Sequence, residues 1–400
     1  MRKSTESSAD VVVVGGGVAG LSAARELGRR GLSVVIIESG LPGAASHAAA
    51  GMLAPQAEAN ASDEMFELLC ASREMYPAFA EQLREESGVC IELDRTGTLY
   101  LAFTEEDEEE ALRRFAWQTR AGLEVERLTA CEARALEPNV SPHVRAALRF
   151  PRDWQVENRR LMSALAASAD AFGARVLRDT KACGVRVVAG RAAGVETTDG
   201  FVSAGAIVLA AGARTSRVPL VVSEREGAQS REEFDSHPLV EPVRGQMLCL
   251  RQTPTRAPFA RHVVYSPRGY IVPRRDGRLL AGSTSERAGF DAAVTAGGVH
   301  AIASHAIEIA PQVASLQLVD SWAGLRPRAA DERPVLGESC EVRRLFYATG
   351  YYRNGILLAP ATGEIVADIV TGGATTWPPH TLKAFSPARH ARALAGSRGN

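Results

Sequence analysis

A glycine-rich segment near the N-terminus, GGGVAG, places Gly15, Gly17 and Gly20 at the spacing GxGxxG. Between a strand and a helix, the first glycine permits a tight turn, the second lets the backbone approach a pyrophosphate, and the third lets the helix pack closely on the sheet. Glu38 follows at the spacing of a carboxylate that binds a ribose 2′-hydroxyl, although a solvated strand end is the alternative for this residue. These residues predict a dinucleotide site that selects FAD or NAD over NADP.

The segments around these glycines have the pattern of a strand–helix–strand unit. Asp10–Val14 is a β-branched run, which is typical of a buried strand in a parallel sheet. Between Val18 and Arg30 apolar residues recur every three positions, and Gly31 suits the C-cap of a helix. A second buried strand is expected from Ser33 to Glu38. The sequence therefore predicts an α/β protein with a Rossmann-type domain.

The rest of the chain predicts further elements and a second sheet. Helices are expected at Glu64–Ser87, after the N-cap residue Thr104, at Leu161–Phe172 and from Gly363 to Val370. Strands are expected at 98–103, 173–177, 184–189, 191–197, 206–210 and 345–349, and those of a mostly antiparallel second sheet at 243–251, 269–274 and 278–282. Arg214–Val240 is polar and aperiodic and predicts a long surface loop, and Pro378 and Pro379 are expected to close the ordered fold.

Composition and charge argue against several classes of function. A length of 400 residues suggests two domains, and 46 Lys and Arg against 47 Asp and Glu leave no electrostatic footprint for nucleic acid or a membrane surface. The N-terminal MRKSTESSAD is polar, and the VVVV that follows is too short for a signal segment or a membrane span, so we expect a cytoplasmic protein. The six cysteines form no CxxC pair and have no metal-ligand spacing, so no metal is expected.

The strand–helix–strand unit alone leaves FAD and NAD undecided, but two later segments favour FAD. LAAGA at 209–213 is a strand end of small residues, including Gly212, that can lie against a cofactor. The segment 346–370 reads as a strand, a glycine-rich turn and a helix. A helix N-terminus aimed at a flavin ring would stabilise the negative charge that reduction places on its N1–C2 edge.

These segments together resemble the D-amino-acid oxidase superfamily of flavoproteins and, within it, the glycine oxidases of thiamine biosynthesis. Six motifs carry the resemblance: GGGVAGLSAARELGRRG (15–31), SHAAAGMLAPQAE (46–58), PVRGQM (242–247), GYIVPRRDGRLLAGST (269–284), WAGLRPRAADERPVLG (322–337) and GYYRNGILLAPATGE (350–364). They are spread over essentially the whole chain. AAAGMLAP and YRNGILLAPATG are much more specific than GxGxxG.

The resemblance implies a discontinuous fold with an FAD-binding domain (1–85, 145–240 and 320–400) and a sheet-based substrate domain (86–144 and 241–319). It implies non-covalent FAD, since GLRPRAADERP lacks the cysteine to which sarcosine oxidases attach the flavin. Besides the residues of the glycine-rich turn and Glu38, the implied FAD contacts are Val18, Ala19, Ser39, Ala45, Ser46, Ala50, Gly51, Met52, Ala182, Tyr351, Tyr352, Arg353, Asn354, Gly355, Ile356 and Leu357.

Five residues match positions at the substrate pocket of the family. Arg326 matches the arginine that binds the substrate carboxylate, with an ordinary ion pair as the alternative, and Arg353 is a second candidate whose alternative is a structural hydrogen bond. Tyr270 matches a tyrosine that touches the same carboxylate, and core packing is its alternative. Met52 packs in the pocket or only in the core, and Glu58 binds the substrate amine or is a solvated acid.

The resemblance implies an FAD-dependent oxidase that converts glycine, and other small amines such as sarcosine or D-alanine, to the imine and 2-oxo acid, with release of hydrogen peroxide and ammonia. Molecular oxygen is the implied second substrate, a homo-oligomer (a tetramer) the implied assembly, and thiazole synthase the implied recipient of the product. The nearest alternative is a D-amino-acid or sarcosine oxidase or dehydrogenase of the same superfamily. A non-catalytic FAD-binding module is the alternative from another class.

Overall fold

The predicted N-terminal unit forms the centre of a ten-stranded sheet in the computed structural model, which describes residues 7–223, 232–234, 237–252 and 258–390. Strand β1 (Ser7–Val14), helix α1 (Val18–Arg29) and strand β2 (Val34–Ile37) confirm the predicted order. β1 lies between β2 and β11 (Gly200–Leu209), and both neighbours run parallel to it. The apolar runs of β1 and β2 are buried on both faces, as expected for central parallel strands.

The other strands of this sheet come from the middle and the end of the chain. The parallel strands are β8 (Arg175–Leu177) beside β2 and β20 (Leu345–Thr349) beside β11. The remaining strands are β9 (Ala182–Val188), β10 (Arg191–Thr197), β12 (Leu220–Ser223), β13 (Glu232–Phe234) and β19 (Val335–Glu338). Each of them has an antiparallel partner, and β12 also pairs in parallel with β9. The ten-stranded sheet is therefore assembled from segments far apart in the sequence.

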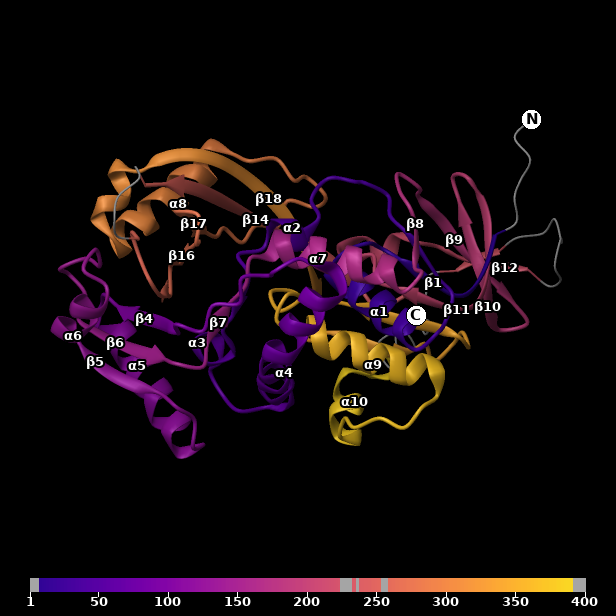
Figure 1. Cartoon of the computed structure of the whole chain (residues 1–400), viewed down its shortest axis with the longest axis horizontal. Helices are drawn as coiled ribbons and strands as arrows, with labels where there is room; N and C mark the ends of the chain where they lie inside the picture. Colours follow the sequence, from indigo (N-terminus) through magenta and orange to yellow (C-terminus); the bar gives the residue numbers. More distant parts are fainter. Residues whose placement is uncertain (1–6, 224–231, 235–236, 253–257, 391–400) are drawn as a thin grey trace, which may run out of the picture.

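Helices cover one face of the ten-stranded sheet (Figure 1). They are α1, α4 (Glu64–Ser87), α7 (Asn158–Ala171), α9 (Ala359–Thr371) and α10 (Pro379–Phe385). Helix α4 has the predicted bounds, with Asp63 as its N-cap and Gly88 in the left-handed conformation as its C-cap. A second apolar cluster joins Val12 and Val14 of β1 with Val185 of β9 and Val195 of β10, which are strands of the same sheet.

A second, eight-stranded sheet confirms the predicted mostly antiparallel architecture. Its order is β18-β14-β17-β16-β15-β4-β6-β5, and only the β15–β4 pair is parallel. The strands are β4 (Thr98–Ala102), β5 (Glu126–Thr129), β6 (Ala146–Phe150), β14 (Val240–Arg251), β15 (Val263–Ser266), β16 (Gly269–Pro273), β17 (Arg278–Gly282) and β18 (Gln317–Ala329). Its helices are α5 (Glu105–Arg120), α6 (Ala130–Leu136) and α8 (Ala296–Ile309), with the 3₁₀ turn η2 (Pro311–Ser315).

Short elements connect the two sheets. Helices α2 (Ala45–Ala48) and α3 (Pro55–Glu58) flank β3 (Met52–Leu53), which pairs with β7 (Trp154–Gln155). The predicted N-cap Thr104 forms a full capping box with Asp107 at the start of α5. Figure 1 shows β14 and β18 as long strands that run from the α8 side of the molecule toward α2.

The prediction that Arg214–Val240 is a long surface loop is wrong in part. The 3₁₀ helix η1 (Gly212–Arg217) and strand β12 occupy its first half, and β12 is held because it pairs in parallel with β9. His237 is buried, with its ring nitrogens 2.9 Å from the Tyr347 hydroxyl and 2.6 Å from the Val218 carbonyl oxygen. Residues 224–231 and 235–236 lie outside the described part of the chain.

The prediction that Pro378 and Pro379 close the fold is also wrong. Proline is well suited to the first turn of a helix, and Pro379 begins α10, whose Phe385 is fully buried.

Several other elements differ from the predicted bounds. Helix α7 begins three residues before its predicted start, α9 four residues before and β11 six residues before. Strands β15 and β18 and helix α8 were not predicted.

The proposed domain boundaries remain a prediction, but sheet membership argues for moving two of them. Strand β6 and the C-terminal part of β18 pair within the eight-stranded sheet, although the predicted boundaries at 145 and 320 assign them to the first domain.

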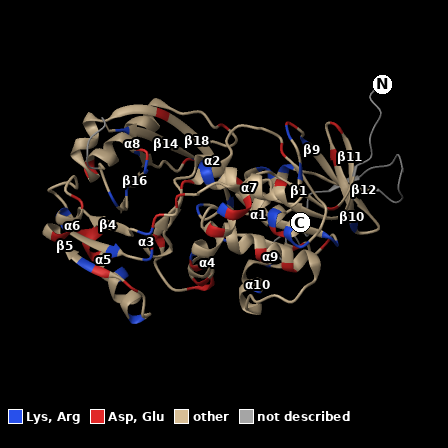
Figure 2. Ribbon diagram, viewed as in Figure 1, with Lys and Arg blue, Asp and Glu red and all other residues tan. Residues whose placement is uncertain are grey.

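Figure 2 shows acidic and basic residues interspersed over the described parts of the chain. Among the described helices, none combines the length and the apolar character needed to cross a membrane.

Candidate active site

A cavity of about 550 Å³ lies where the carboxyl ends of β1 and β2 meet the eight-stranded sheet. Twenty-three of the predicted site residues line it: Gly15, Gly17, Val18, Ala19, Glu38, Ser39, Ala45, Ser46, Ala50, Gly51, Met52, Glu58, Ala182, Gly212, Tyr270, Arg326, Tyr351, Tyr352, Arg353, Asn354, Gly355, Ile356 and Leu357. Gly20 does not. A Cβ at Gly20 would lie 1.9 Å from the Gly15 carbonyl oxygen, so this glycine permits the close packing of α1 on the sheet.

The N-terminus of α1 forms one wall of the cavity and fits a pyrophosphate. Gly17 is the N-cap and offers no side-chain cap, while the Val18 N–H donates to the Ser46 hydroxyl at 3.0 Å. Gly15 has φ +112°, and a Cβ there would lie 2.4 Å from the Ala210 carbonyl oxygen. The backbone thus comes close to the cavity without side chains between, which is the arrangement that a dinucleotide requires.

Glu38 lies at the carboxyl end of β2 with both carboxylate oxygens facing backbone N–H groups. One oxygen accepts from Gly16 at 2.6 Å and the other from Gly40 at 2.9 Å. These bonds fix the carboxylate beside the glycine-rich turn, where a ribose is expected.

The turn Tyr351–Leu357 also lines the cavity, with Gly355 beside Val18 of α1, and it leads directly into α9. The Tyr352 N–H donates to the Pro327 carbonyl oxygen at 2.7 Å, and the Thr362 hydroxyl donates to the Tyr351 hydroxyl at 3.0 Å. These bonds tie the turn both to β18 and to the first turn of α9. The N-terminal end of α9 therefore lies next to the lining residues and favours negative charge there.

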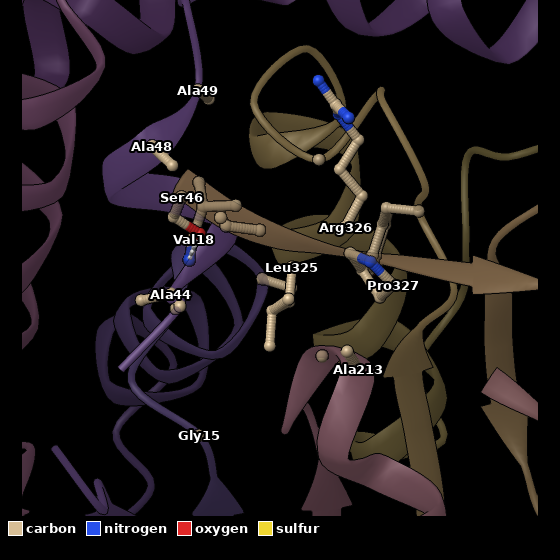
Figure 3. A pocket seen from close by; sticks show the side chains of 18 of the residues that line it. Gly15, Val18, Ala44, Ser46, Ala48, Ala49, Ala213, Leu325, Arg326 and Pro327 are labelled. Carbon is tan, nitrogen blue, oxygen red and sulfur yellow. Dashed lines mark hydrogen bonds between the residues drawn. The ribbon is translucent and has the colours of Figure 1, made fainter. Parts of the chain in front are cut away.

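Arg326 projects from β18 into the cavity, while its neighbour Leu325 extends to the other side of the strand (Figure 3). Its guanidinium donates to the Thr284 carbonyl oxygen at 2.9 Å and to the Ser283 hydroxyl at 2.7 Å. It lies across Gly245 of β14, where a Cβ would come within 2.2 Å of Nη1. No carboxylate lies within ion-pair distance of Arg326 among the described residues. Burial and the nearby charge of Arg353 lower the pKa of Arg326.

Tyr270 and Met52 lie on the cavity side of the second sheet. The Tyr270 hydroxyl donates to the Met247 sulfur at 3.3 Å, and its ring stacks on Tyr265 with centroids 6.4 Å apart. Met52 pairs with Gln155 and packs against the apolar cluster around Met247. Both side chains are only partly buried, so each has a free edge toward the cavity.

Glu58 is positioned by a buried polar cradle around the short helix α3. The fully buried carboxylate of Asp153 accepts the N–H groups of Gln56 at 3.2 Å and Ala57 at 2.7 Å, and Arg114 donates to the Ala57 carbonyl oxygen. A four-residue helix has few bonds of its own, so these contacts fix where Glu58 lies.

Glu58 and Arg353 are two titratable groups of the cavity whose pKa values are raised. Burial raises the pKa of Glu58 above its usual value, and the charges of Arg353 and Arg326 offset this only in part. Burial opposes the charge of Arg353, but the Tyr352 hydroxyl and the Glu58 carboxylate raise its pKa. Arg353 is thus a permanent cation, and its contact with the Tyr352 hydroxyl is long, at 3.5 Å.

Replacing Glu58 by glutamine is expected to stabilise the protein at neutral pH. The folded-state pKa lies above the unfolded-state value of 4.5, so the contribution of Glu58 to stability falls as the pH rises from 4.5 through the folded-state pKa. The gain in the free energy of unfolding should be present near neutral pH and vanish in acid. Denaturant unfolding at both pH values checks this, with the exposed Glu85→Gln on α4 as the control. A gain that is independent of pH would contradict the assigned pKa direction.

The sequence analysis missed the residues that shape the space around Arg326. These are Gly245, Met247, Ser283, Gly324 and Pro327, all of which line the cavity. A Cβ at Gly324 would lie 2.5 Å from the Ala48 Cβ, and one at Gly282 would lie 2.4 Å from the Met247 sulfur. For Gly245 and Gly282, a glycine inside a predicted strand was the available signal, because it marks the close approach of a ligand or of another part of the chain.

Comparison with known proteins agrees with this geometry. The model of the DAO family, described as FAD dependent oxidoreductase, matches residues 10–369. The chain is 38% identical to the glycine oxidase of Geobacillus kaustophilus over 95% of this chain and 97% of that protein. The crystal structure of the G. kaustophilus enzyme superposes with a TM-score of 0.86 over 96% of this chain and 99% of the other. The chain is also 34% identical, over 96% of its length, to 54% of the bifunctional protein ThiO/ThiG of Synechocystis. The chain belongs to the DAO family of FAD-dependent oxidoreductases.

Proposed function

We propose that this protein is a glycine oxidase, which converts glycine, oxygen and water to glyoxylate, ammonia and hydrogen peroxide. The observation that carries the proposal is the guanidinium of Arg326, which lies in the cofactor cavity without a carboxylate partner among the described residues. A half-buried arginine that lines a cavity, and whose N–H groups meet no carboxylate of the protein, is suited to a bidentate carboxylate. The similarity to the glycine oxidase of G. kaustophilus supports glycine as the substrate.

The side chains of the cavity orient the substrate. Arg326 holds the carboxylate, and the Tyr270 hydroxyl can bond the same group after leaving the Met247 sulfur. Glu58 lines the same cavity, where its carboxylate can hold the ammonium group or take a proton from it. The cavity residues described above would hold FAD, which would supply the two-electron acceptor for oxidation at the substrate Cα. Because orientation and charge suffice for this, no strong general base is needed from the protein.

Oxygen uptake by the FAD-loaded protein tests the proposal. Glycine, sarcosine, D-alanine, D-proline and L-alanine are compared side by side, with peroxide and ammonia measured in the same samples. Uptake with stoichiometric peroxide, strongest for glycine, is the expected result. Bleaching of the flavin by glycine only in the absence of oxygen would instead identify a dehydrogenase. Failure of every amine to bleach the flavin would overturn the amine-oxidising function and leave cofactor binding alone.

Gly245→Ala is expected to weaken substrate binding without loss of the fold. The new methyl group would overlap the Arg326 guanidinium, which is the end of a flexible side chain and can move aside. The KM for glycine should rise about 100-fold, equivalent to about 3 kcal/mol, while the flavin spectrum stays unchanged. The matched control is the double variant with Arg326→Ala, which should be no worse than Arg326→Ala alone. Additive losses in the double variant would show that Gly245 acts by another route.

Several finer features belong to the same proposal. We propose that FAD is held non-covalently, since no cysteine or histidine is among the described residues that line the cavity. We also propose a cytoplasmic homo-oligomer, a tetramer by resemblance, that uses molecular oxygen. The relative named ThiO/ThiG supports a proposed link between the product and thiazole synthase. Analytical ultracentrifugation tests the assembly, and co-purification with thiazole synthase tests the link.

A further inference from the structure

Two arginines, Arg214 and Arg217, extend the cavity wall that begins at the end of β11. Ala210–Ala213 forms that wall, and Gly15 of the phosphate-binding turn packs directly against it. The 3₁₀ helix η1 then carries both arginines, and both line the cavity. They therefore stand on the side of the cavity that faces the N-terminus of α1. We call them the arginine pair.

Arg214 connects two walls of the cavity. Its Nη2 donates to the Pro42 carbonyl oxygen at 3.1 Å. Pro42 lies in the loop between Glu38 and Ser46, and the Ser46 hydroxyl accepts from the first turn of α1. The Arg214 side chain thus crosses from the Ala210–Ala213 wall to the loop that holds Ser46. The Arg214 side chain therefore joins the two walls beside the place where the pyrophosphate is expected.

The charge of the arginine pair is not balanced by the protein. Within the described residues, neither guanidinium lies within ion-pair distance of a carboxylate. Both instead lie over the ring of Phe290, with Cζ-to-centroid distances of 5.0 Å for Arg214 and 4.3 Å for Arg217. The adjacent Asp291 pairs with Arg244 at 2.9 Å. Burial and the neighbouring Arg217 charge lower the pKa of Arg214, as expected for like charges without an anion.

An anion that fits this place is the diphosphate of the bound dinucleotide. It carries two negative charges, whereas the N-terminus of α1 supplies only about half a positive charge. We propose that the arginine pair neutralises the diphosphate of FAD and that Arg214, by bridging the two walls, retains the cofactor in the cavity. The proposal rests on FAD binding and not on the amine that is oxidised. Phe290 holds the two guanidinium groups side by side and so pre-organises them.

Titration of the full chain with FAD, after removal of the cofactor, tests the arginine pair. The affinity is read from flavin fluorescence for the wild type and for Arg214→Met/Arg217→Met, which keeps the apolar contact with Phe290 but removes the charges. Arg113→Met, at an exposed site on α5, is the matched control. Each charge-assisted contact is worth about tenfold in affinity, so the Kd of the double variant should rise about 100-fold at low salt.

Salt distinguishes an electrostatic function from a packing function. Raising the ionic strength from about 0.02 M to about 1 M screens partly exposed charges, so the ratio of the two Kd values should shrink to less than about tenfold. An unchanged Kd in the double variant overturns the proposal. A ratio that stays constant with salt also overturns it, because it assigns the loss to packing. Neither readout depends on turnover of any amine, so failure here and failure of the glycine oxidase function are separable.

Discussion

Arg326→Ala is expected to lower kcat/KM for glycine by roughly 10³, or about 4 kcal/mol, with FAD still bound. The loss should appear mainly as a higher KM, because the guanidinium holds a carboxylate that is present in both the ground state and the transition state. Arg326 meets only the Thr284 carbonyl oxygen and the Ser283 hydroxyl, so its removal leaves no buried carboxylate unpaired and should leave the fold intact.

Steady-state kinetics with glycine and with a neutral amine that lacks a carboxylate make this test specific. The amine should be a poor substrate for both proteins, and its rate should be nearly insensitive to the substitution. Arg326→Lys, which keeps the charge but not the planar pair of donors, should recover only part of the loss. An unchanged KM for glycine in Arg326→Ala would remove Arg326 from the substrate site.

Gly20→Ala is expected to destabilise the protein by about 3 kcal/mol and to release FAD. Its new Cβ would lie 1.9 Å from the Gly15 carbonyl oxygen and 3.2 Å from a Val13 methyl carbon, so backbone has to move. The displaced backbone is the glycine-rich turn itself, which is the predicted pyrophosphate site. Both stability and cofactor affinity should therefore fall together.

The matched control for Gly20→Ala is Gly297→Ala in the first turn of α8. A Cβ at Gly297 meets no atom within 4 Å, so this change should be neutral or slightly stabilising. Thermal unfolding and the FAD content after gel filtration are compared for both variants. Equal FAD content in Gly20→Ala and the wild type would show that α1 can shift without disturbing the turn.

The sequence predicted the dinucleotide-binding end of the cavity because local rules determine it. A β-branched strand, a glycine-rich turn and a helix with one apolar face are encoded within about 30 consecutive residues, so no distant contact is needed to recognise them. β1, α1 and β2 accordingly follow the prediction within a few residues. Glu38 and the three glycines are where this pattern puts them.

The substrate end was harder because long-range pairing determines it. Strand β18 contains Gly324 and Pro327, which normally argue against a strand, and its first residues are exposed. It forms nonetheless, because it pairs with β14 over nearly its full length at the edge of the sheet. Arg326 was identified by resemblance alone, and its orientation over Gly245 follows from that pairing.

The segment after Arg214 is a second case in which pairing between distant segments could not be predicted from the sequence. Its polar, aperiodic composition hid β12, whose partner β9 lies more than 30 residues earlier in the chain. The function of Arg214 was hidden for the same reason. Its neighbours Pro42 and Phe290 are far away in sequence and become contacts only in the folded chain.

The ten-stranded sheet takes its strands from distant parts of the chain, and this has a consequence for the order of events during protein synthesis. The glycine-rich turn leaves the ribosome early, but β20 and the turn Tyr351–Leu357, which complete the cavity, come near the end of the chain. Until β20 emerges, the C-terminal half of β11 is an unpaired apolar strand edge, which is prone to aggregation and proteolysis. Capture of the cofactor is therefore a late step of biogenesis, and a chain interrupted before residue 345 ends as a target for degradation rather than as a partly active enzyme.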